Sequence, residues 1–406
     1  MSSAMDLLAD IDVVDPYPLW QALLEGPPHV AADGSLALVT DLTQCAALLR
    51  DPRMSSDHRN SDHFKNVRLP TLSQQDLERF EKREVFLFRD PPVHTRLRRL
   101  VSKAFTPRTV EGLRPFIEKR TDELLTAAAD RGRLELVSDL AYPLPVAVIS
   151  EMLGVPHEDH ETFAHWSAVL AKGLDSLMSE PDPAEQAEQM RASDEFRAYF
   201  HELAEKRRAQ PRDDLMSALV AAEESGDRLS MDELASTALL LLIAGHETTV
   251  SLIGNAMLAL LRVPGLLDRV RESPDLADGI VEEVLRLDPP VQLTMRTALE
   301  DVDLPGGTVK AGGSVILLIA AANRDASALA DPLAFDPDRD DAQHLSFGGG
   351  IHFCLGAPLA RLEGRIVVAE LARRLVNPRL DELTYRENRV LRGPSRLVVG
   401  YDDLRG

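Results

Sequence analysis

The sequence predicts a mainly α-helical protein with a small β region, an α+β fold. Three observations lead to this fold class: helical periodicity dominates, strand signals are short and scattered, and one apolar segment at 234–261 has the length of a very long helix. No linker, internal repeat or low-complexity tract interrupts the 406 residues. We therefore expect residues 1–406 to form one domain, a helix-rich body with a small β subdomain.

Apolar residues at intervals of three and four predict the other helices, and short apolar runs bounded by turn residues predict the strands. The predicted strands lie at 36–40, 315–321 and 396–399, with further strand signal after Val291. The predicted helices lie at 42–49, 113–129, 143–153, 161–177, 187–208, 213–224 and 276–287.

The apolar segment at 234–261 is the one stretch long enough to cross a membrane, yet His246 and Glu247 occupy its middle, where a bilayer is driest. A buried helix is the better interpretation. Ser230 and Glu233 form a capping-box pattern at its start, and Arg262 is its last residue before Pro264. At 1.5 Å per residue such a helix is roughly 45 Å long.

Charge and cysteine content exclude several classes of protein. The chain has 45 basic and 66 acidic residues, a net charge of −21, which opposes binding to nucleic acid. Its two cysteines, Cys45 and Cys354, are far apart, so neither a disulfide framework nor a cysteine-rich zinc site is expected. Residues 1–20 contain four Asp and no basic residue, unlike a secretory leader. We expect a cytoplasmic protein without a membrane span.

Glycines crowd one side of Cys354, in the sequence Phe-Gly-Gly-Gly-Ile-His-Phe-Cys-Leu-Gly at 347–356. Glycine permits backbone angles and close approaches that other residues do not, and Pro358 suits the first turn of a helix. Cys354 should therefore lie just before a helix N-terminus, where N–H groups and the helix dipole stabilise a thiolate. The alternative is a small buried residue in a glycine turn.

This loop resembles the haem-thiolate loop of the cytochrome P-450 superfamily, with the pattern Phe-Gly-x-Gly-x-x-x-Cys-x-Gly. All fixed positions match, namely Phe347, Gly348, Gly350, Cys354 and Gly356. The resemblance implies the cytochrome P-450 fold, in which a long central helix lies over a buried haem b. It further implies that Cys354 is the axial ligand of the haem iron and that Phe347 shields the sulfur.

A second motif lies at the middle of the long helix, where a buried carboxylate and hydroxyl cost free energy unless they have partners. It resembles the family's oxygen-activation motif at Ala244, Gly245, His246, Glu247 and Thr248. The resemblance implies that Thr248 hydrogen-bonds the activated oxygen and that Glu247 relays protons to it. A zinc-protease pattern fails because Val250 stands where its second histidine is required. A polar kink satisfied within the helix is the other alternative.

Two further sets of residues match family positions. Glu283 and Arg286, three apart on one helix, resemble the family's Glu-x-x-Arg, and Arg339 matches the arginine that completes a structural triad. Haem propionates require cationic or hydrogen-bonding partners. The resemblance assigns this role to His94, Arg98, Arg296 and His352.

The segment 91–110 carries five basic residues and no acidic one. We hypothesise that Arg96, Arg99 and Lys103, together with Arg361 and Arg365 after the cysteine, form a basic patch that steers an acidic ferredoxin. A solvated helix face is the alternative. No flavin or NADPH module is present, so electrons should come from a separate ferredoxin and its NAD(P)H-dependent ferredoxin reductase.

The resemblance implies a soluble bacterial monooxygenase that uses dioxygen to hydroxylate or epoxidise a hydrophobic small molecule. Similarity to actinobacterial members suggests a macrolide, a polyketide, a terpenoid or a steroid as substrate. A peroxide-using or isomerising haem enzyme and a haem sensor without turnover are the alternatives. Candidate substrate-lining residues by matching position are Phe86, Leu87, Leu240, Ala244, Val291, Leu293 and Leu391.

Overall fold

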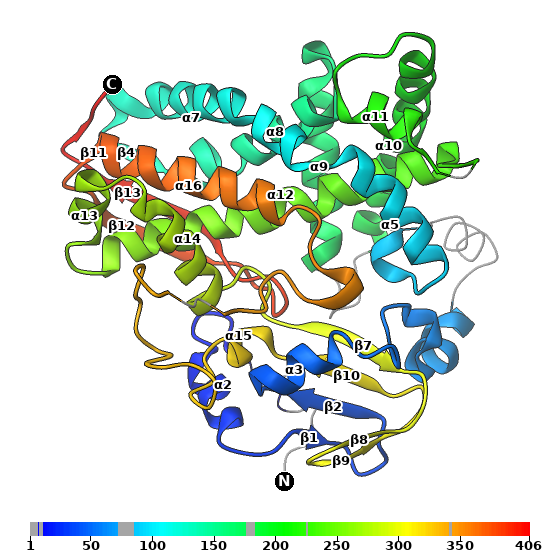
Figure 1. Ribbon diagram of the computed structural model, residues 1–406. Helices are drawn as coiled ribbons and strands as arrows, with labels where there is room; N and C mark the ends of the chain where they lie inside the picture. The colour runs from blue at the N-terminus through cyan, green and yellow to red at the C-terminus, as the bar shows by residue number, and fades with distance from the viewer. Residues whose placement is uncertain (1–6, 8–10, 72–84, 176–182, 225, 341–342) are drawn as a thin grey trace. The chain divides into compact units, whose positions relative to one another are not determined.

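The computed structural model describes residues 7, 11–71, 85–175, 183–224, 226–340 and 343–406 (Figure 1). The chain divides into two compact units, which are described separately. The first unit comprises 1–96, 285–354 and 388–392, and the second comprises 97–284, 355–387 and 393–406. Two of the boundaries fall inside helices, α5 (Val93–Ala104) and α14 (Leu276–Leu287). The expectation of one domain stays a prediction.

A five-stranded sheet with the strand order β1-β2-β10-β7-β3 organises the first unit. Strand β10 pairs in parallel with β2 and antiparallel with β7, so that Ser314 lies between Leu36 and Thr297. The strands are β1 (His29–Val30), β2 (Leu36–Val39), β3 (Met54–Ser55), β7 (Thr294–Ala298) and β10 (Ser314–Leu317), with a separate hairpin of β8 (Val302–Leu304) and β9 (Gly307–Val309). The helices are α2 (Tyr17–Leu24), α3 (Leu42–Leu48) and α15 (Ile319–Ala322).

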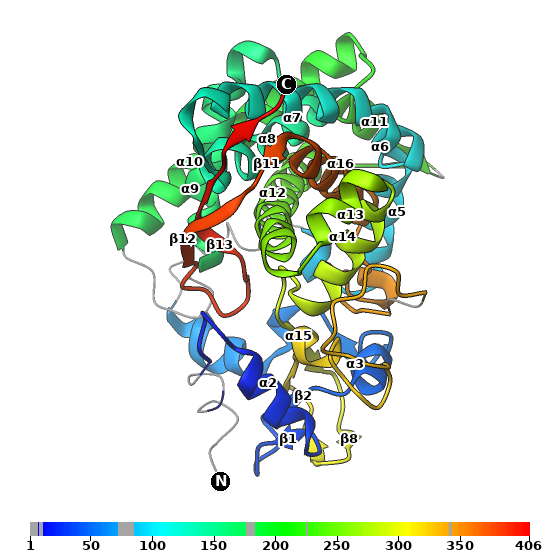
Figure 2. The same ribbon diagram turned by 90° about the vertical axis from the view of Figure 1, so that its left-hand side faces the viewer.

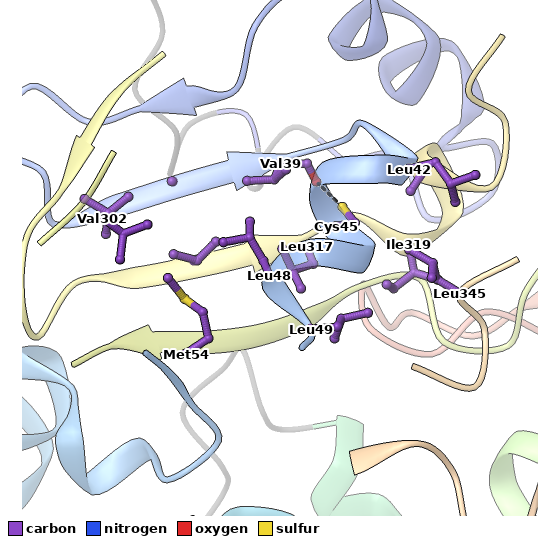
Figure 3. Packing of buried hydrophobic residues seen from close by; sticks show 14 of the residues in the cluster. Val39, Leu42, Cys45, Leu48, Leu49, Met54, Val302, Leu317, Ile319 and Leu345 are labelled. Carbon is purple, nitrogen blue, oxygen red and sulfur yellow. Dashed lines mark hydrogen bonds between the residues drawn. The ribbon is translucent and has the colours of Figure 1, made fainter. Parts of the chain in front are cut away.

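Helix α3 packs against this sheet and closes an apolar core, shown in Figure 3. Cys45 is fully buried on α3, and its thiol lies 3.4 Å from the carbonyl oxygen of Val39. Burial, assisted by the nearby charge of Asp41, raises the pKa of the Cys45 thiol well above its ordinary value. Cys45 therefore behaves as a packed apolar residue, and the predicted helix around it is confirmed.

The second unit is mostly helical, with small strand pairings at its periphery. Its larger sheet has the order β12-β13-β4, from Arg379–Tyr385, Pro394–Gly400 and Arg133–Glu135. Two pairs add β5 (Glu223–Glu224) with β6 (Asp227–Arg228) and β11 (Leu375–Val376) with β14 (Asp403–Leu404). The helices are α6 (Pro107–Gly112), α7 (Arg114–Ala128), α8 (Pro143–Leu153), α9 (His160–Asp175), α10 (Pro183–Ala209), α11 (Leu215–Ala221), α12 (Met231–Arg262), α13 (Leu266–Glu272) and α16 (Ala357–Arg374).

Helix α12 is the long helix predicted from the sequence. Ser230 caps it, with the side chain of Ser230 accepting from the N–H of Glu233 and the Glu233 carboxylate accepting from the N–H of Ser230. Figure 2 views α12 nearly along its axis, with α16 on one side and β13 on the other. Of the described helices only α12 is long and apolar enough to span a membrane. Within its apolar 18-residue stretch, 72% is buried inside the protein. The prediction of a buried helix is confirmed.

Two predicted elements differ from the structure. The apolar run 315–321 splits into the end of β10 and the start of α15, since periodicity does not distinguish a buried strand from a buried helix and three alanines favour the helix. The predicted helix 213–224 is longer than the observed helix α11, which spans only Leu215–Ala221. Asp214 caps its start by accepting from the N–H of Ser217, and the chain then enters strand β5.

Candidate functional site

The glycine-rich loop closes on itself and presents the thiol of Cys354 at the surface. The N–H of Cys354 donates to the carbonyl oxygen of Phe347 over 2.9 Å, and the cysteine is exposed. Gly356 then caps α16, with Pro358 in the first turn, as the sequence predicted. An accessible sulfur beside a helix N-terminus fits an anionic ligand for a metal ion.

The glycines of this loop have separate structural reasons. Gly348 and Gly350 adopt φ angles of 70° and 63°, in the left-handed region. A Cβ atom at Gly350 would lie 2.4 Å from the carbonyl oxygen of Leu49, whereas a Cβ at Gly348 would meet nothing closer than 3.9 Å. The loop thus lies directly on the C-terminal end of α3, and a side chain at Gly350 would separate them.

Three of the four predicted propionate partners belong to the first unit. His94 is buried, and its ring lies 4.2 Å from the ring of His352 between centroids. Arg296 on β7 donates to the carbonyl oxygen of Met295, and burial lowers the pKa of its guanidinium despite the opposing charge of Asp90. A buried cation and two neighbouring imidazoles fit an anionic group such as a propionate.

The fourth predicted partner, Arg98, belongs to the second unit. It stands four residues after His94 on α5, so the prediction that both residues occupy one helix is confirmed. The side chain of Arg98 is half-buried.

Two of the predicted scaffold residues, Glu283 and Arg286, are buried, whereas Arg339 is partly exposed. Arg286 is fully buried and donates to the carbonyl oxygens of Pro332 and Ala334, at 2.6 and 2.8 Å. Arg339 donates to the carbonyl oxygens of Ala330 and Asp331 in the same stretch of chain. The two arginines therefore fasten the segment 330–334. Glu283, buried on α14 in the second unit, completes the predicted set.

Helix α12 has one accessible strip in an otherwise buried length. Between 233 and 258 every residue is buried except five, at 240, 243, 244, 245 and 248. Leu240, Ala244 and Thr248 recur every four residues, so they share one face of the helix. The Thr248 hydroxyl donates to the carbonyl oxygen of Ala244 over 2.8 Å. A strip of this kind fits a helix that faces a bound group rather than protein.

Behind that strip, Glu247 is almost completely buried between two basic side chains. Its Oε1 lies 2.8 Å from Nε2 of His246, and its Oε2 forms an ion pair with Arg386. Burial alone raises the pKa of the Glu247 carboxyl, but the hydrogen bond and charge of His246, joined by Arg386, outweigh it and hold the pKa below its ordinary value. No local sequence pattern points to Arg386, which lies in a polar segment far along the chain from Glu247.

The predicted substrate-lining residues of the first unit have different surroundings. Phe86 is buried beside the ring of His94, while Leu87 is exposed. Val291 and Leu391 face each other in an isolated antiparallel bridge. Leu293, in contrast, packs in the core cluster with Trp20 and Ile316, so its side chain supports the sheet.

The predicted basic patch is uneven in its charge. Arg99 and Lys103 are exposed on α5, and Arg96 is half-buried. Arg361 forms two hydrogen bonds with the carboxylate of Glu282, at 2.6 and 2.9 Å, and Arg365 lies within 3.7 Å of Glu111 and 3.6 Å of Asp278. Adjacent carboxylates thus offset the charges of Arg361 and Arg365.

A surface cleft of about 530 Å³ lies in the second unit between α7 and α16. Its walls are mainly charged side chains, and Arg365 is the one predicted site residue among them. This cleft lacks the apolar lining expected for a hydrophobic substrate.

Comparison with known proteins gives consistent similarities over nearly the whole chain. A family model described as Cytochrome P-450 matches residues 52–376. The cytochrome P-450 monooxygenase PikC of Streptomyces venezuelae is 43% identical over 397 residues, 95% of this chain and 91% of that protein. The vitamin D(3) 25-hydroxylase of Pseudonocardia autotrophica is 41% identical over 403 residues, 97% of this chain and 96% of that protein. The crystal structure of ligand-free Mycobacterium smegmatis CYP164A2 matches with a TM-score of 0.85 at 45% identity, covering 98% of both chains.

Proposed function

Because this chain belongs to the cytochrome P-450 family and is therefore a monooxygenase with haem b as cofactor, we propose that it hydroxylates or epoxidises a hydrophobic small molecule. The observation that carries this proposal is the glycine-rich loop that presents the Cys354 thiol before the N-terminus of α16. Bound haem supplies the iron centre at which dioxygen is activated, with one oxygen atom entering the substrate and the other leaving as water.

Cys354 is the proposed iron ligand, and the neighbouring residues hold its loop. The carbonyl oxygen of Phe347 accepts the hydrogen bond from the N–H of Cys354 and so closes the loop that carries the sulfur. Gly348 and Gly350 provide the left-handed backbone, and Gly356 begins α16. Arg286 and Arg339, with Glu283, stabilise the chain before this loop, in keeping with their hydrogen bonds to 330–334.

His94, Arg98, Arg296 and His352 are the proposed partners of the haem propionates. The close pair of imidazoles and the buried guanidinium support this role for His94, His352 and Arg296. Each side chain can donate hydrogen bonds to a carboxylate, and a buried guanidinium gains a counter-charge from it.

Glu247 and Thr248 are the proposed proton-delivery residues. Thr248 lies on the accessible strip of α12, where its hydroxyl can meet a reacting group, while Glu247 is buried behind it and is ionised. A carboxylate can take up a proton and release it again, and a hydroxyl can pass one on. The role is proton transfer, since neither group is placed as a nucleophile with an adjacent base.

The proposed substrate is a macrolide, polyketide, terpenoid or steroid. By matching position, the proposed apolar lining residues are Leu240 and Ala244 of the second unit and, in the first unit, Phe86, Leu87, Val291 and Leu391. A related protein named as a vitamin D(3) 25-hydroxylase supports a large, hydrophobic and oxidisable molecule. Apolar walls select such molecules mainly through the surface that they remove from water.

An acidic ferredoxin and its NAD(P)H-dependent reductase are the proposed electron donors. Arg99 and Lys103 are exposed on α5 in a chain of net charge −21, which supports local attraction of an acidic partner. Arg96, Arg361 and Arg365 are the other proposed residues of this surface, and carboxylates lie beside Arg361 and Arg365. Two free cysteines are in keeping with a cytoplasmic location.

The proposal is tested by combining the haem-loaded protein with ferredoxin, reductase, NADPH and a panel of the four compound classes in ¹⁸O-labelled dioxygen. We expect at least one compound to accelerate NADPH consumption and to gain one labelled oxygen atom. If no compound accelerates NADPH consumption, the protein is a sensor or carrier without turnover. A product without label indicates peroxide or isomerase chemistry. Either result contradicts the proposal.

A further inference from the structure

His246 occupies the variable position of the α12 motif, and both nitrogens of its ring face hydrogen-bond acceptors. The ring is completely buried. Its Nδ1 lies 3.0 Å from the carbonyl oxygen of Leu242, and its Nε2 lies 2.8 Å from Oε1 of Glu247. The Ser167 hydroxyl approaches the same ring at 3.3 Å from Nδ1 and adapts as donor or acceptor.

The hydrogen-bond contacts of His246 indicate that His246 and Glu247 share one proton. The shorter contact of Nδ1 is with the carbonyl oxygen of Leu242, which only accepts, and this contact favours hydrogen on Nδ1 over a bond donated by Ser167. The contact between Nε2 and a carboxyl oxygen then needs one more proton, on either His246 or Glu247. Arg386 pairs with the other carboxyl oxygen and favours the ionised form of Glu247. The extra proton therefore lies on His246, as an imidazolium beside a carboxylate.

We propose that His246 stores the proton that Glu247 delivers, and that Arg386 positions the carboxylate to receive it. This inference rests on the proposed role of Glu247. In the transfer, the N–H bond at Nε2 breaks as an O–H bond forms at Oε1, which leaves a neutral imidazole with hydrogen on Nδ1. One net proton from solvent then restores the imidazolium of His246 after Glu247 has released its own. The proton thus starts its path inside the helix, behind the accessible strip.

Among the described residues, the aromatic and hydroxyl side chains that contact the His246 ring are uncharged. The ring of Tyr142 stands edge-on to His246 at 5.4 Å between centroids. Burial raises the pKa of the Tyr142 phenol, so this residue stays neutral. Ser167 on α9 is also neutral, and the Arg386 side chain is only 16% exposed. The proton that can move between two charged groups of the cluster is therefore the one shared by His246 and Glu247.

The protonation state is measurable without turnover. We would label histidine rings with ¹⁵N in the haem-loaded enzyme and record spectra of its diamagnetic ferrous carbon monoxide complex at pH 7. Of the eleven histidines, we expect the one that disappears in His246→Asn to have hydrogen on both nitrogens. In Glu247→Gln the carboxylate is gone, and the same ring should become neutral. A wild-type ring with hydrogen on one nitrogen alone, whichever nitrogen it is, would overturn the proposal.

Turnover provides the second readout, with Ser167→Ala as the control because it removes a neutral neighbour of the same ring. We expect His246→Asn to lower product formed per NADPH by at least about tenfold with KM unchanged, while Ser167→Ala retains the wild-type ratio. Arg386→Lys should form more product per NADPH than Arg386→Gln, because lysine keeps the positive charge beside Glu247. If Glu247→Gln also retains coupling, the proposed function of Glu247 fails. If Glu247→Gln uncouples and His246→Asn does not, this inference alone fails.

Discussion

Alanine substitution at two glycines of the cysteine loop should have clearly different effects. Both Gly348 and Gly350 have a left-handed backbone, which costs an alanine about 1 kcal/mol. At Gly348 the added methyl group has space, so the loss should stay near that value. At Gly350 the methyl group would lie 2.4 Å from the carbonyl oxygen of Leu49, and reaching ordinary contact at 3.4 Å requires a movement of about 1 Å.

Overpacking of this size costs about a further 1–3 kcal/mol. The free energy of unfolding of Gly350→Ala should therefore fall by about 2–4 kcal/mol in total. At roughly 2 °C per kcal/mol, Gly348→Ala should lower Tm by about 2 °C and Gly350→Ala by about 4–8 °C. The assay is thermal unfolding of the haem-loaded proteins followed by circular dichroism, with haem content measured by absorption. Equal shifts for the two variants would refute the packing of this loop against α3.

The remaining predictions concern a buried acid, the catalytic threonine and the basic surface. Burial raises the pKa of the Glu363 carboxyl to about 8. The contribution of this group to stability is therefore complete below its ordinary pKa of about 4.5 and is lost as pH rises toward 8. The Tm of Glu363→Gln should rise relative to that of wild type between these two pH values, and a constant difference in Tm would contradict the buried, neutral carboxyl. Thr248→Ala should release peroxide and lower product per NADPH severalfold, whereas an unchanged yield per electron would remove Thr248 from proton delivery. Charge reversal at Arg99 and Lys103 should slow reduction by ferredoxin about tenfold at low salt and flatten its salt dependence. An unchanged rate and salt dependence would contradict the proposed partner surface.

Local sequence signals predicted the elements that local forces determine. Ser230 and Glu233 identified the start of α12 because a capping box is made within four residues. The helices at 143–153 and 276–287 were also predicted with their observed limits. The prediction of one strand over 315–321 missed the change from β10 to α15. Burial on all sides removes the periodicity that distinguishes a strand from a helix.

Sequence analysis did not identify Arg386 and Glu282, because the role of each depends on a contact with a distant part of the chain. The motif at 244–248 pointed to Glu247, but its ion pair comes from Arg386, 139 positions later. The same holds for Glu282, which offsets the charge of Arg361 through a contact between α14 and α16. Sequence composition reports that a charge exists, while its effect depends on which opposite charge the fold places beside it.

The central claim is that Cys354 binds haem iron as a thiolate. The most direct test is the absorption spectrum of the purified protein, reduced and then exposed to carbon monoxide, compared with Cys354→Ser. We predict a strongly red-shifted Soret band in the wild type that is absent from the variant. A folded wild-type protein without haem, or with an unshifted band, would contradict the thiolate assignment and the roles derived from it.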